Sequence, residues 1–127
     1  MSEFQSLDLQ SIREPRGELT VMQDALPFAV RRIYWVSGAD GETRGRHRHH
    51  TTRQALVAIA GCIDVYLNDG RHEATVRLHA PSRCLLVEPE DWHTMRFGTG
   101  SVLLVMASTV YDPSDYITEP YRVEPRA

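Results

Sequence analysis

Gly41-Glu-Thr-Arg-Gly-Arg-His47-Arg-His49-His-Thr-Thr-Arg-Gln54-Ala-Leu-Val-Ala-Ile-Ala-Gly61 is the most informative stretch of this sequence. Side chains two positions apart on a β-strand point to the same face. His47 and His49 are therefore expected to project together, with Arg48 and His50 on the opposite face. Burying two adjacent imidazoles that do no work is costly, which favours a working site over the alternative, a packed pair of core histidines.

Short apolar runs separated by turn residues extend this pattern on both sides. Asn68-Asp69-Gly70 predicts a tight hairpin turn, because these residues tolerate the positive φ that such turns require. Turn signals recur roughly every 8 to 12 residues, as expected for a sandwich or barrel of antiparallel strands. An edge strand is expected in the first dozen residues, and a short helix only within 113–121. The other strands are expected over 18–22, 30–36, 54–60, 62–67, 73–78, 85–87, 94–97 and 101–107.

Length and composition indicate one folded domain spanning residues 1–127. Hydrophobic residues make up 42% and charged residues 24%, the balance of a globular chain. The formal net charge of -3 predicts no general attraction to nucleic acid or to anionic membranes. The longest apolar stretches, such as 102–107, are too short to span a membrane, and the first residues lack the features of a secretory signal. A cytoplasmic location is expected, with Cys62 and Cys84 as buried free thiols.

The chain contains no lysine, so its 14 Lys and Arg positions are all arginine. This composition excludes Schiff-base chemistry and a phosphate-binding P-loop lysine. Because arginine stays protonated at neutral pH, any proton transfer must use a histidine, a carboxylate or a tyrosine. The cluster of Arg44, Arg46, Arg48 and Arg53 lacks interleaved aromatic residues. We interpret it as a phosphate site with a solvated face rather than an RNA-binding surface.

The spacing of the glycines and histidines in residues 41–61 resembles the first sequence motif of the cupin family. Pro89-Glu-Asp-Trp-His93 is similar to the looser second motif. The resemblance implies an all-β fold, a cupin jelly-roll barrel (double-stranded β-helix).

Catalytic cupins usually hold a metal ion with two histidines, a glutamate and a third histidine. Here Gln54 occupies the glutamate position, and a neutral amide brings no charge to offset a cation. The sequence therefore favours a site without a metal or other cofactor, with a zinc ion on His47, His49 and His93 as the alternative. Without a metal, imidazoles of ordinary pKa, about 6.5, can accept and return a proton at neutral pH, as keto–enol isomerisation requires.

A more specific resemblance covers about residues 17–121. Arg44-Gly-x-His-x-His followed by Gln54 resembles the sugar-nucleotide 3,4-ketoisomerases of the cupin superfamily. Three further segments are similar to theirs: Arg32-Ile-Tyr34-Trp, Pro89-x-x-Trp92-His93 and Tyr111-Asp-Pro-Ser-Asp-Tyr116-Ile. This resemblance implies an isomerase without metal or cofactor that moves the ketone of dTDP-4-keto-6-deoxy-D-glucose from C4 to C3, in deoxyamino-sugar biosynthesis. It also implies a homodimer with exchanged N-terminal strands.

The same resemblance assigns roles to individual residues. His47 is the base that moves the proton between C3 and C4, and His49 assists proton transfer at the sugar oxygens. Apart from the resemblance, the position of Arg32 in its strand is interpreted as the face opposite Tyr34, where Arg32 either contacts the dimer partner or the nucleotide or has no such role. Trp92 is expected to line the pocket, stack on a base or pack in the core. The substrate-binding residues are expected to be Tyr34, Arg44, Gln54, Trp92, His93 and Arg32.

The chain departs from the family at residues 47–50, where His47-Arg48-His49-His50 replaces the common His-Ala-His-Lys. The departure leaves the neighbouring packing and the nucleotide identity open, as are the C4 configuration of the product and the downstream pathway. The alternative functions are an epimerase or dehydratase on a related keto sugar nucleotide, a metal-dependent cupin oxygenase, and a sugar-binding cupin without catalysis.

Overall fold

The computed structural model describes residues 4–122, and nearly all of their regular structure is β-strand. Within that range the elements in chain order are β1 (Ser6–Asp8), β2 (Gln10–Glu14), β3 (Gly17–Val21), β4 (Arg32–Val36), β5 (Thr43–His49), β6 (Gln54–Ala60), β7 (Ile63–Asn68), β8 (Glu73–Leu78), β9 (Arg83–Val87), β10 (Trp92–Phe97), β11 (Val102–Ala107), the 3-10 turn η1 (Pro113–Asp115) and β12 (Tyr116–Ile117). No helix within residues 4–122 is long and apolar enough to cross a membrane.

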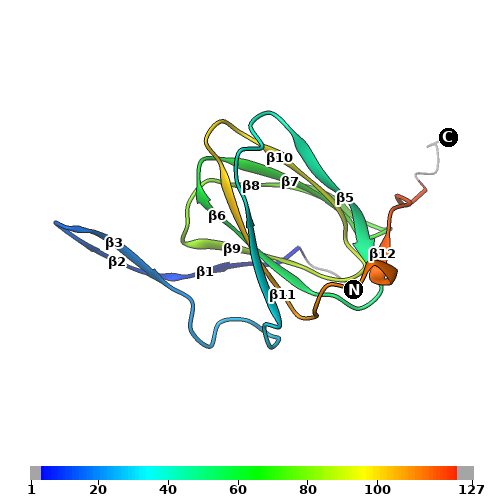
Figure 1. The fold of residues 1–127 in the computed structure, drawn as a ribbon, viewed down its shortest axis with the longest axis horizontal. Helices are drawn as coiled ribbons and strands as arrows, with labels where there is room; N and C mark the ends of the chain where they lie inside the picture. Colours follow the sequence, from blue (N-terminus) through cyan, green and yellow to red (C-terminus); the bar gives the residue numbers. More distant parts are fainter. Residues whose placement is uncertain (1–3, 123–127) are drawn as a thin grey trace.

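Two five-stranded antiparallel sheets face each other and enclose the core (Figure 1). One sheet has the strand order β1-β9-β6-β11-β4, and the other has the order β12-β5-β10-β7-β8. Large apolar side chains from both sheets fill the space between them, including the fully buried Leu56, Ile63, Phe97 and Leu103. This arrangement confirms the predicted all-β jelly-roll barrel.

Strand β6 is buried on both faces, which explains why its sequence is continuously apolar rather than alternating. Leu56 and Ala58 face the barrel core, whereas Ala55 and Val57 belong to a second cluster on the outer side of the same sheet. Partly buried side chains from β1 and from segment 22–28 pack against this second cluster. The segment before β4 therefore covers the barrel without entering it.

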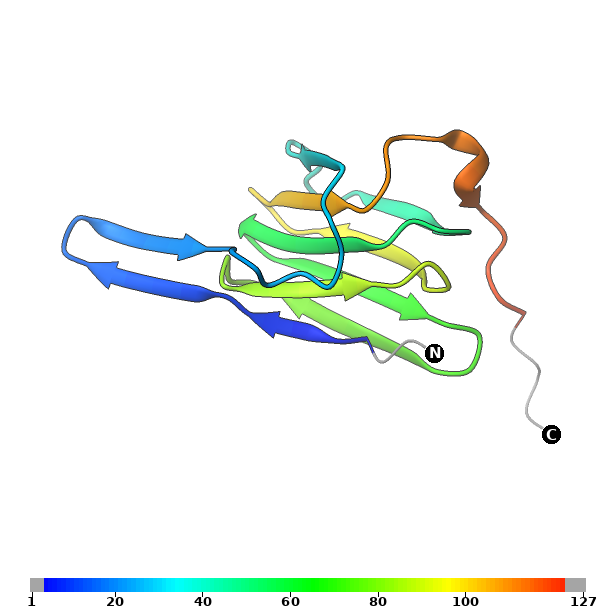
Figure 2. The same cartoon turned by 90° about the horizontal axis from the view of Figure 1, so that it is seen from below.

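Strands β2 and β3 form a hairpin that extends away from the barrel (Figures 1 and 2). It pairs with neither of the two large sheets. Its apolar side chains Ile12 and Leu19 are 46% and 59% exposed. An isolated two-stranded hairpin without a packed face is marginally stable in water, so this projection has little internal stabilisation.

The predicted strands occur with end points shifted by no more than two residues. The N-terminal edge strand is β1, which pairs with β9, and the predicted short helix is reduced to η1. The turn after β7 is longer than predicted. Asn68 pairs with Glu73, and the Asp69 carboxylate accepts hydrogen bonds from the backbone N–H groups of Arg71 and His72 at 2.8 and 2.7 Å. Both cysteines are free; Cys84 is buried as predicted, but Cys62 is only half-buried.

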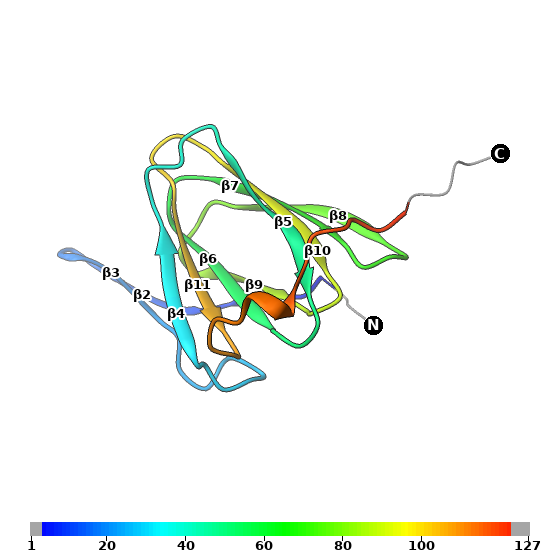
Figure 3. The same cartoon turned by 45° about the vertical axis from the view of Figure 1, so that its right-hand side comes forward.

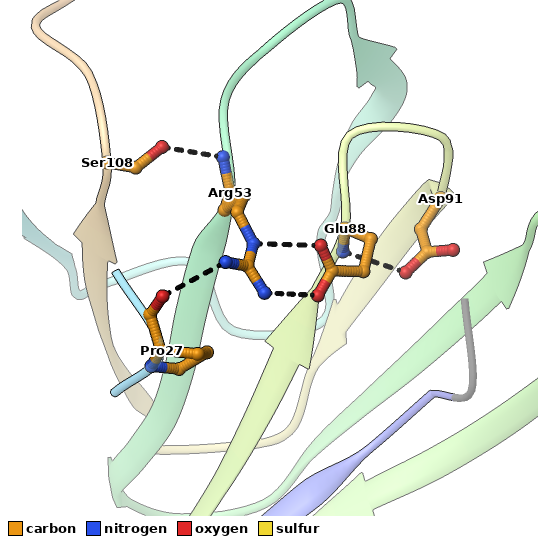
Figure 4. A network of polar contacts seen from close by, with 5 residues as sticks. All are labelled: Pro27, Arg53, Glu88, Asp91 and Ser108. Carbon is orange, nitrogen blue, oxygen red and sulfur yellow. Dashed lines mark hydrogen bonds and ion pairs between the residues drawn. The ribbon is translucent and has the colours of Figure 1, made fainter. Parts of the chain in front are cut away.

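One arginine joins three separate parts of the barrel (Figure 4). Arg53 precedes β6, and its guanidinium makes a two-pronged ion pair with Glu88, which follows β9, with N–O distances of 2.9 Å for both bonds. A third N–H group donates to the Pro27 carbonyl at 3.1 Å. The Arg53 backbone N–H donates to the hydroxyl of Ser108 after β11, and the Glu88 N–H donates to Asp91. Arg53, in the turn between β5 and β6, thus links the start of β6 to the ends of β9 and β11 and to the segment before β4.

We expect Arg53→Ala to lower the free energy of unfolding by about 1–3 kcal/mol, because Glu88 would be left without its partner in a half-buried position. The control is Arg77→Ala. Arg77 pairs with Asp64 on the surface, and its side chain is 66% exposed, against 33% for Arg53. An exposed pair of this kind contributes little to stability, so Arg77→Ala should lower the free energy of unfolding much less than Arg53→Ala does. Urea denaturation measures both values, and equal losses in the two variants would contradict the prediction.

Candidate active site

A β-bulge in β5 sets the position of the histidines. His47 pairs with His93 of β10, but the next pair joins Thr94 to Gly45, so Arg46 is an extra residue in β5. Gly45 and Arg46 both have positive φ angles, 92° and 61°. A Cβ atom on Gly45 would lie 2.9 Å from the backbone oxygen of His93, so only glycine allows β5 to approach β10 this closely. The bulge therefore brings the imidazoles of neighbouring strands opposite each other.

Three imidazoles and a phenol form one contiguous cluster. The ring centroid of His47 lies 4.8 Å from that of His49 and 4.9 Å from that of His93. The Tyr116 ring lies 4.7 Å from His47 and 4.8 Å from His49. Tyr116 reaches this position because β12 pairs with β5 at His49, and Figure 3 shows η1 and β12, in orange, beside that end of β5. His47 is thus the central ring of the cluster.

His47 lines a cavity of about 390 Å³, a volume in the range of small-molecule sites. The cavity lies inside the barrel mouth and has an apolar and a polar part. Its apolar lining residues are Val36, Leu56, Met95, Leu103 and Val105. Its polar and aromatic lining residues are Arg32, Tyr34, Arg44, His47, Gln54, His93, Tyr111 and Tyr116. Two arginines and no carboxylate of residues 4–122 line it, so its charge favours an anionic ligand.

The tautomer of His93 is fixed by its surroundings. Its Nδ1 lies 3.0 Å from the Asp91 carbonyl oxygen, and a carbonyl oxygen only accepts, so Nδ1 carries the proton. Burial lowers the pKa of His93 to about 3, and this backbone hydrogen bond opposes the effect only in part. The ring is therefore neutral at physiological pH, and Nε2 is its unprotonated nitrogen.

The other two imidazoles are also held in the neutral state. Burial lowers the pKa of His47, and a hydrogen bond with the backbone of Gly45 acts in the opposite direction. Burial lowers the pKa of His49 to about 4, the neighbouring His47 lowers it further, and the Asp115 carboxylate raises it. A neutral imidazole facing a cavity is the form that accepts a proton.

Tyr34 and Gln54 meet across the cavity wall. The Gln54 side-chain Nε2 donates a hydrogen bond to the Tyr34 hydroxyl oxygen at 3.2 Å. Burial raises the pKa of Tyr34, so its hydroxyl stays protonated. Because the oxygen already accepts from Gln54, the O–H group of Tyr34 is available to donate to a ligand.

The expected placement of Arg32 on the opposite face from Tyr34 is wrong. The two residues are two positions apart on β4 and therefore share a face. The Arg32 guanidinium carbon lies 5.1 Å from the centroid of the Tyr34 ring and 5.5 Å from that of Tyr111, and all three residues line the cavity. Arg32 and Arg44 thus present two guanidinium groups to the same space.

Two of the predicted site residues do not line the cavity. His49 is buried behind Tyr116 and His47, and neither of its ring nitrogens has a hydrogen-bond partner within residues 4–122. Trp92 precedes the inward-facing His93 and so points to the other face of β10, where its Nε1 donates to the Thr118 carbonyl at 3.4 Å. The remaining predicted residues, His47, Tyr34, Arg44, Gln54, His93 and Arg32, all line the cavity.

The arginines of residues 44–53 do not form one basic patch. Arg44 lines the cavity, whereas Arg46 donates to the Thr43 carbonyl at 2.8 Å. The Arg48 guanidinium carbon lies 4.4 Å from the centroid of the Tyr121 ring, and Arg53 is paired with Glu88. Alternation along β5 and the bulge at Arg46 separate these side chains.

Tyr111 and Tyr116 also line the cavity, although neither was predicted as a site residue. They lie in the segment between β11 and the end of the described chain, more than sixty residues after the His47 strand. The signal available was the similarity of the segment Tyr111-Asp-Pro-Ser-Asp-Tyr116-Ile to the corresponding family segment. Within residues 4–122, no three His, Cys, Asp or Glu side chains are grouped so that they could hold a metal ion.

Comparisons with known proteins match almost the whole chain. A family model described as FdtA, WxcM-like, C-terminal, matches residues 2–123. A TDP-4-oxo-6-deoxy-alpha-D-glucose-3,4-oxoisomerase from Aneurinibacillus thermoaerophilus is 34% identical over 117 residues, which cover 89% of this chain and 84% of that protein. The similarity therefore includes the strands that carry the cavity and is not confined to the histidine motif.

Solved structures match equally well. QdtA, a sugar 3,4-ketoisomerase from Thermoanaerobacterium thermosaccharolyticum in complex with TDP, is 32% identical with a TM-score of 0.88, covering 94% of this chain and 90% of that one. A variant of QdtA with a histidine replaced by asparagine, in complex with TDP-4-keto-6-deoxyglucose, is 31% identical with the same TM-score of 0.88. The WlaRB TDP-quinovose 3,4-ketoisomerase from Campylobacter jejuni is 32% identical with a TM-score of 0.88, covering 94% and 95% of the two chains.

The buried imidazoles predict how the stability of the protein depends on pH. Between the ordinary pKa of about 6.5 and the lowered values, each imidazole is protonated in the unfolded chain but neutral in the folded one. The unfolded state then binds more protons, so the free energy of unfolding is highest above this window and falls as the pH falls from about 6.5. The expected slope is about 1.4 kcal/mol per pH unit for each such imidazole.

Urea denaturation at several pH values between 7 and 5 measures this slope. In the His93→Gln variant, the unfolded state should bind about one proton fewer relative to the folded state than in the wild type. The stability should therefore depend less steeply on pH. A wild-type stability that is constant over this interval would show that the imidazoles are not shielded from water in the way described.

Proposed function

The chain belongs to the WxcM-like FdtA family, and from this membership we infer that it is a sugar-nucleotide 3,4-ketoisomerase. It is an enzyme that moves the ketone of dTDP-4-keto-6-deoxy-D-glucose from C4 to C3, as a step in deoxysugar biosynthesis. The structural observation that best supports this chemistry is the neutral His47 ring in the wall of a cavity lined by two arginines. A neutral imidazole at this place can remove a proton next to a carbonyl group and return it to the neighbouring carbon.

His47 is the base in our proposal for the reaction. It removes the proton from C3 of the 4-keto sugar, and the C3–C4 unit becomes an enediolate. The protonated His47 then returns a proton to C4. In the same process the C3 oxygen loses its hydroxyl proton and the C4 oxygen gains one, so the product is an isomer of the substrate with the ketone at C3.

Two other residues that line the cavity suit the proton transfers at the sugar oxygens. Tyr34 has an O–H group free to donate towards the C4 oxygen, and His93 has a neutral Nε2 atom able to accept from the C3 hydroxyl. His49, which the resemblance assigned to this role, contacts the His47 ring rather than the cavity. We therefore assign His49 to holding the His47 ring, and Tyr34 and His93 to the sugar oxygens.

Arg32 and Arg44 are proposed to bind the diphosphate of the nucleotide. Both guanidinium groups line the cavity, and guanidinium binds phosphate oxygens through two parallel hydrogen bonds. Arg32 lies between the Tyr34 and Tyr111 rings, and this contact orients its guanidinium group at little entropic cost. Tyr111 is exposed and can stack on the nucleobase. Gln54 is proposed to orient the Tyr34 hydroxyl through its hydrogen bond rather than to contact the substrate. Trp92 is not assigned a substrate contact.

The test of the proposal is conversion of dTDP-4-keto-6-deoxyglucose by the purified protein, with NMR identification of the product. His47→Asn is expected to lower kcat by about 10²–10⁴-fold, because it removes the acid–base group while keeping a side chain of similar size. Loss of deuterium from C3 of a labelled substrate should fall in parallel. The control is His72→Asn, at an exposed turn remote from the cavity, which should be as active as the wild type.

The product and the activity of the His47 variant distinguish the possible functions. Full activity of the His47 variant would remove this residue from the mechanism. A product with an inverted centre at C3 or C5 and the ketone still at C4 would make the protein an epimerase, and loss of water would make it a dehydratase. The same spectrum gives the configuration at C4 of the product.

We propose that residues 1–127 form one domain that exchanges its N-terminal strands in a homodimer. The support is the β2–β3 hairpin, which projects from the barrel with exposed apolar side chains and has no sheet of its own chain to pack against. Strand β4, at the edge of its sheet, also exposes Ile33 and Trp35 on its outer face. A cytoplasmic location stays a prediction, and the free Cys62 and Cys84 thiols are compatible with a reducing compartment.

The dimer is tested by light scattering on the purified protein. The wild type is expected to have twice the chain mass of 14.5 kDa, and Leu19→Asp in the hairpin is expected to shift the population towards the monomer, because it places a charge in an apolar contact. Val110→Asp replaces an exposed apolar residue that lies in neither the β2–β3 hairpin nor strand β4, and it should leave the mass unchanged. A monomeric wild type would contradict the proposal.

A further inference from the structure

Asp115, the residue before Tyr116, has no part in the mechanism described so far, although it is only 8% exposed. Its carboxylate lies against the turn between β5 and β6, 64 residues from Thr51 in the chain. Oδ1 accepts hydrogen bonds from the N–H and hydroxyl groups of Thr51, both at 2.9 Å. Oδ2 accepts from the N–H group of Thr52 at 3.2 Å and from its hydroxyl. The Asp115 carbonyl accepts from the His50 N–H at 3.0 Å.

These bonds keep the carboxylate ionised. Burial by itself raises the pKa of Asp115, but the hydrogen bonds donated by the side chains and backbone of Thr52 and Thr51 together lower it below its ordinary value. A buried carboxylate is tolerated where donors surround it. The position of Asp115 is therefore fixed to the turn that follows the histidine strand.

The residues that follow Asp115 in the chain form part of the site. Tyr116 and Ile117 add β12 to the edge of β5, opposite His49 and Arg48. The Tyr116 ring contacts both His47 and His49 and lines the cavity. β12 is only two residues long, so its own ladder cannot hold it firmly in place.

We propose that Asp115 is a positioning residue of the isomerase, which fastens β12 to the β5–β6 turn so that Tyr116 closes over His47 and His49. The proposal rests on the function inferred above and deepens it. Without this anchor the segment after β11 would be free to move away from the barrel, and water would reach the imidazole pair. Asp115 itself touches neither the cavity nor a histidine ring.

The charge of Asp115 has a second effect on the same pair. It raises the pKa of His49, which burial, His47 and Arg32 all lower. The groups that face His49 from the elements packed against it are His47, His93, Tyr116 and Arg32. Of this set and Asp115, only Asp115 is a carboxylic acid. The positive charge that forms when His47 accepts the sugar proton lies against His49, and we expect the negative charge of Asp115 to favour it.

The test compares Asp115→Asn with Asp112→Asn. Asp112 lies in the same segment, but it is exposed, and its carboxylate accepts from Ser114, at 3.0 Å from the N–H and 2.8 Å from the hydroxyl. Asp115→Asn should lower kcat by about 10- to 100-fold, because a displaced Tyr116 disturbs the reacting geometry. Binding of TDP, which lacks the sugar ring, should be unchanged in calorimetry. Asp112→Asn should match the wild type in both.

The pH profile of kcat/KM separates positioning from general loss of structure. In Asp115→Asn its acid limb should move to lower pH, because the charge that raises the pKa of His49 is gone and His49 is electrostatically coupled to the base His47. Asp115→Glu restores the charge and should return the limb towards its wild-type position while kcat stays reduced. Thr51→Val removes one hydrogen bond but keeps the carboxylate, so it should lower kcat less and leave the limb in place.

Several results would overturn the proposal. These are wild-type kcat and pH profile in Asp115→Asn, or an equal loss in Asp112→Asn. If Asp115→Asn fails to fold, a wild-type kcat in Thr51→Val would likewise contradict the proposal. A test independent of turnover uses nuclear Overhauser effects between the Tyr116 ring and the His47 and His49 imidazoles. These should be present in the wild type and in Asp112→Asn but weaker in Asp115→Asn, and unchanged effects would overturn the proposal even if the wild type converts no substrate.

Discussion

The close approach of β5 to β10 at Gly45 is the constraint on which the site depends. With a Cβ position only 2.9 Å from the His93 carbonyl oxygen, this contact is possible for glycine alone. The bulge at Arg46 that accompanies it sets the register in which His47 faces His93. A shift of the β5 register by one residue would turn His47 and His49 to the outside of the barrel, so the chemistry of the site depends on this backbone contact.

Burial then gives the site its electrostatic character. The barrel withdraws three imidazoles from water, and the loss of solvation keeps them neutral at physiological pH. At the same time two arginines line the cavity, and no carboxylate of the described chain, residues 4–122, lines it with them. A site that combines neutral bases with fixed positive charge suits a substrate that carries its negative charge on a diphosphate and its reactive carbon on an uncharged sugar.

Much of this could be predicted from the sequence, and the failures have physical reasons. The strands and the shared face of His47 and His49 followed from periodicity, and the family followed from the resemblance of the quoted segments to known 3,4-ketoisomerases. The prediction for Arg32 was wrong although strand alternation already places Arg32, two positions from Tyr34, on the same face. The position of His49 behind the cavity wall was not available from spacing, because alternation gives the face of a strand but not the depth of a side chain in the barrel.

The sequence by itself determined the set of chemical groups: histidines without lysines, a glutamine where related metal sites have a carboxylate, and a glycine inside the histidine strand. It also determined the period of the strands, since local sterics and side-chain alternation act over a few residues. Only the tertiary structure decided which groups share the cavity. Tyr116 and Asp115 meet the histidine strand across more than sixty residues of chain, and such contacts depend on how the sheets close and not on any local pattern.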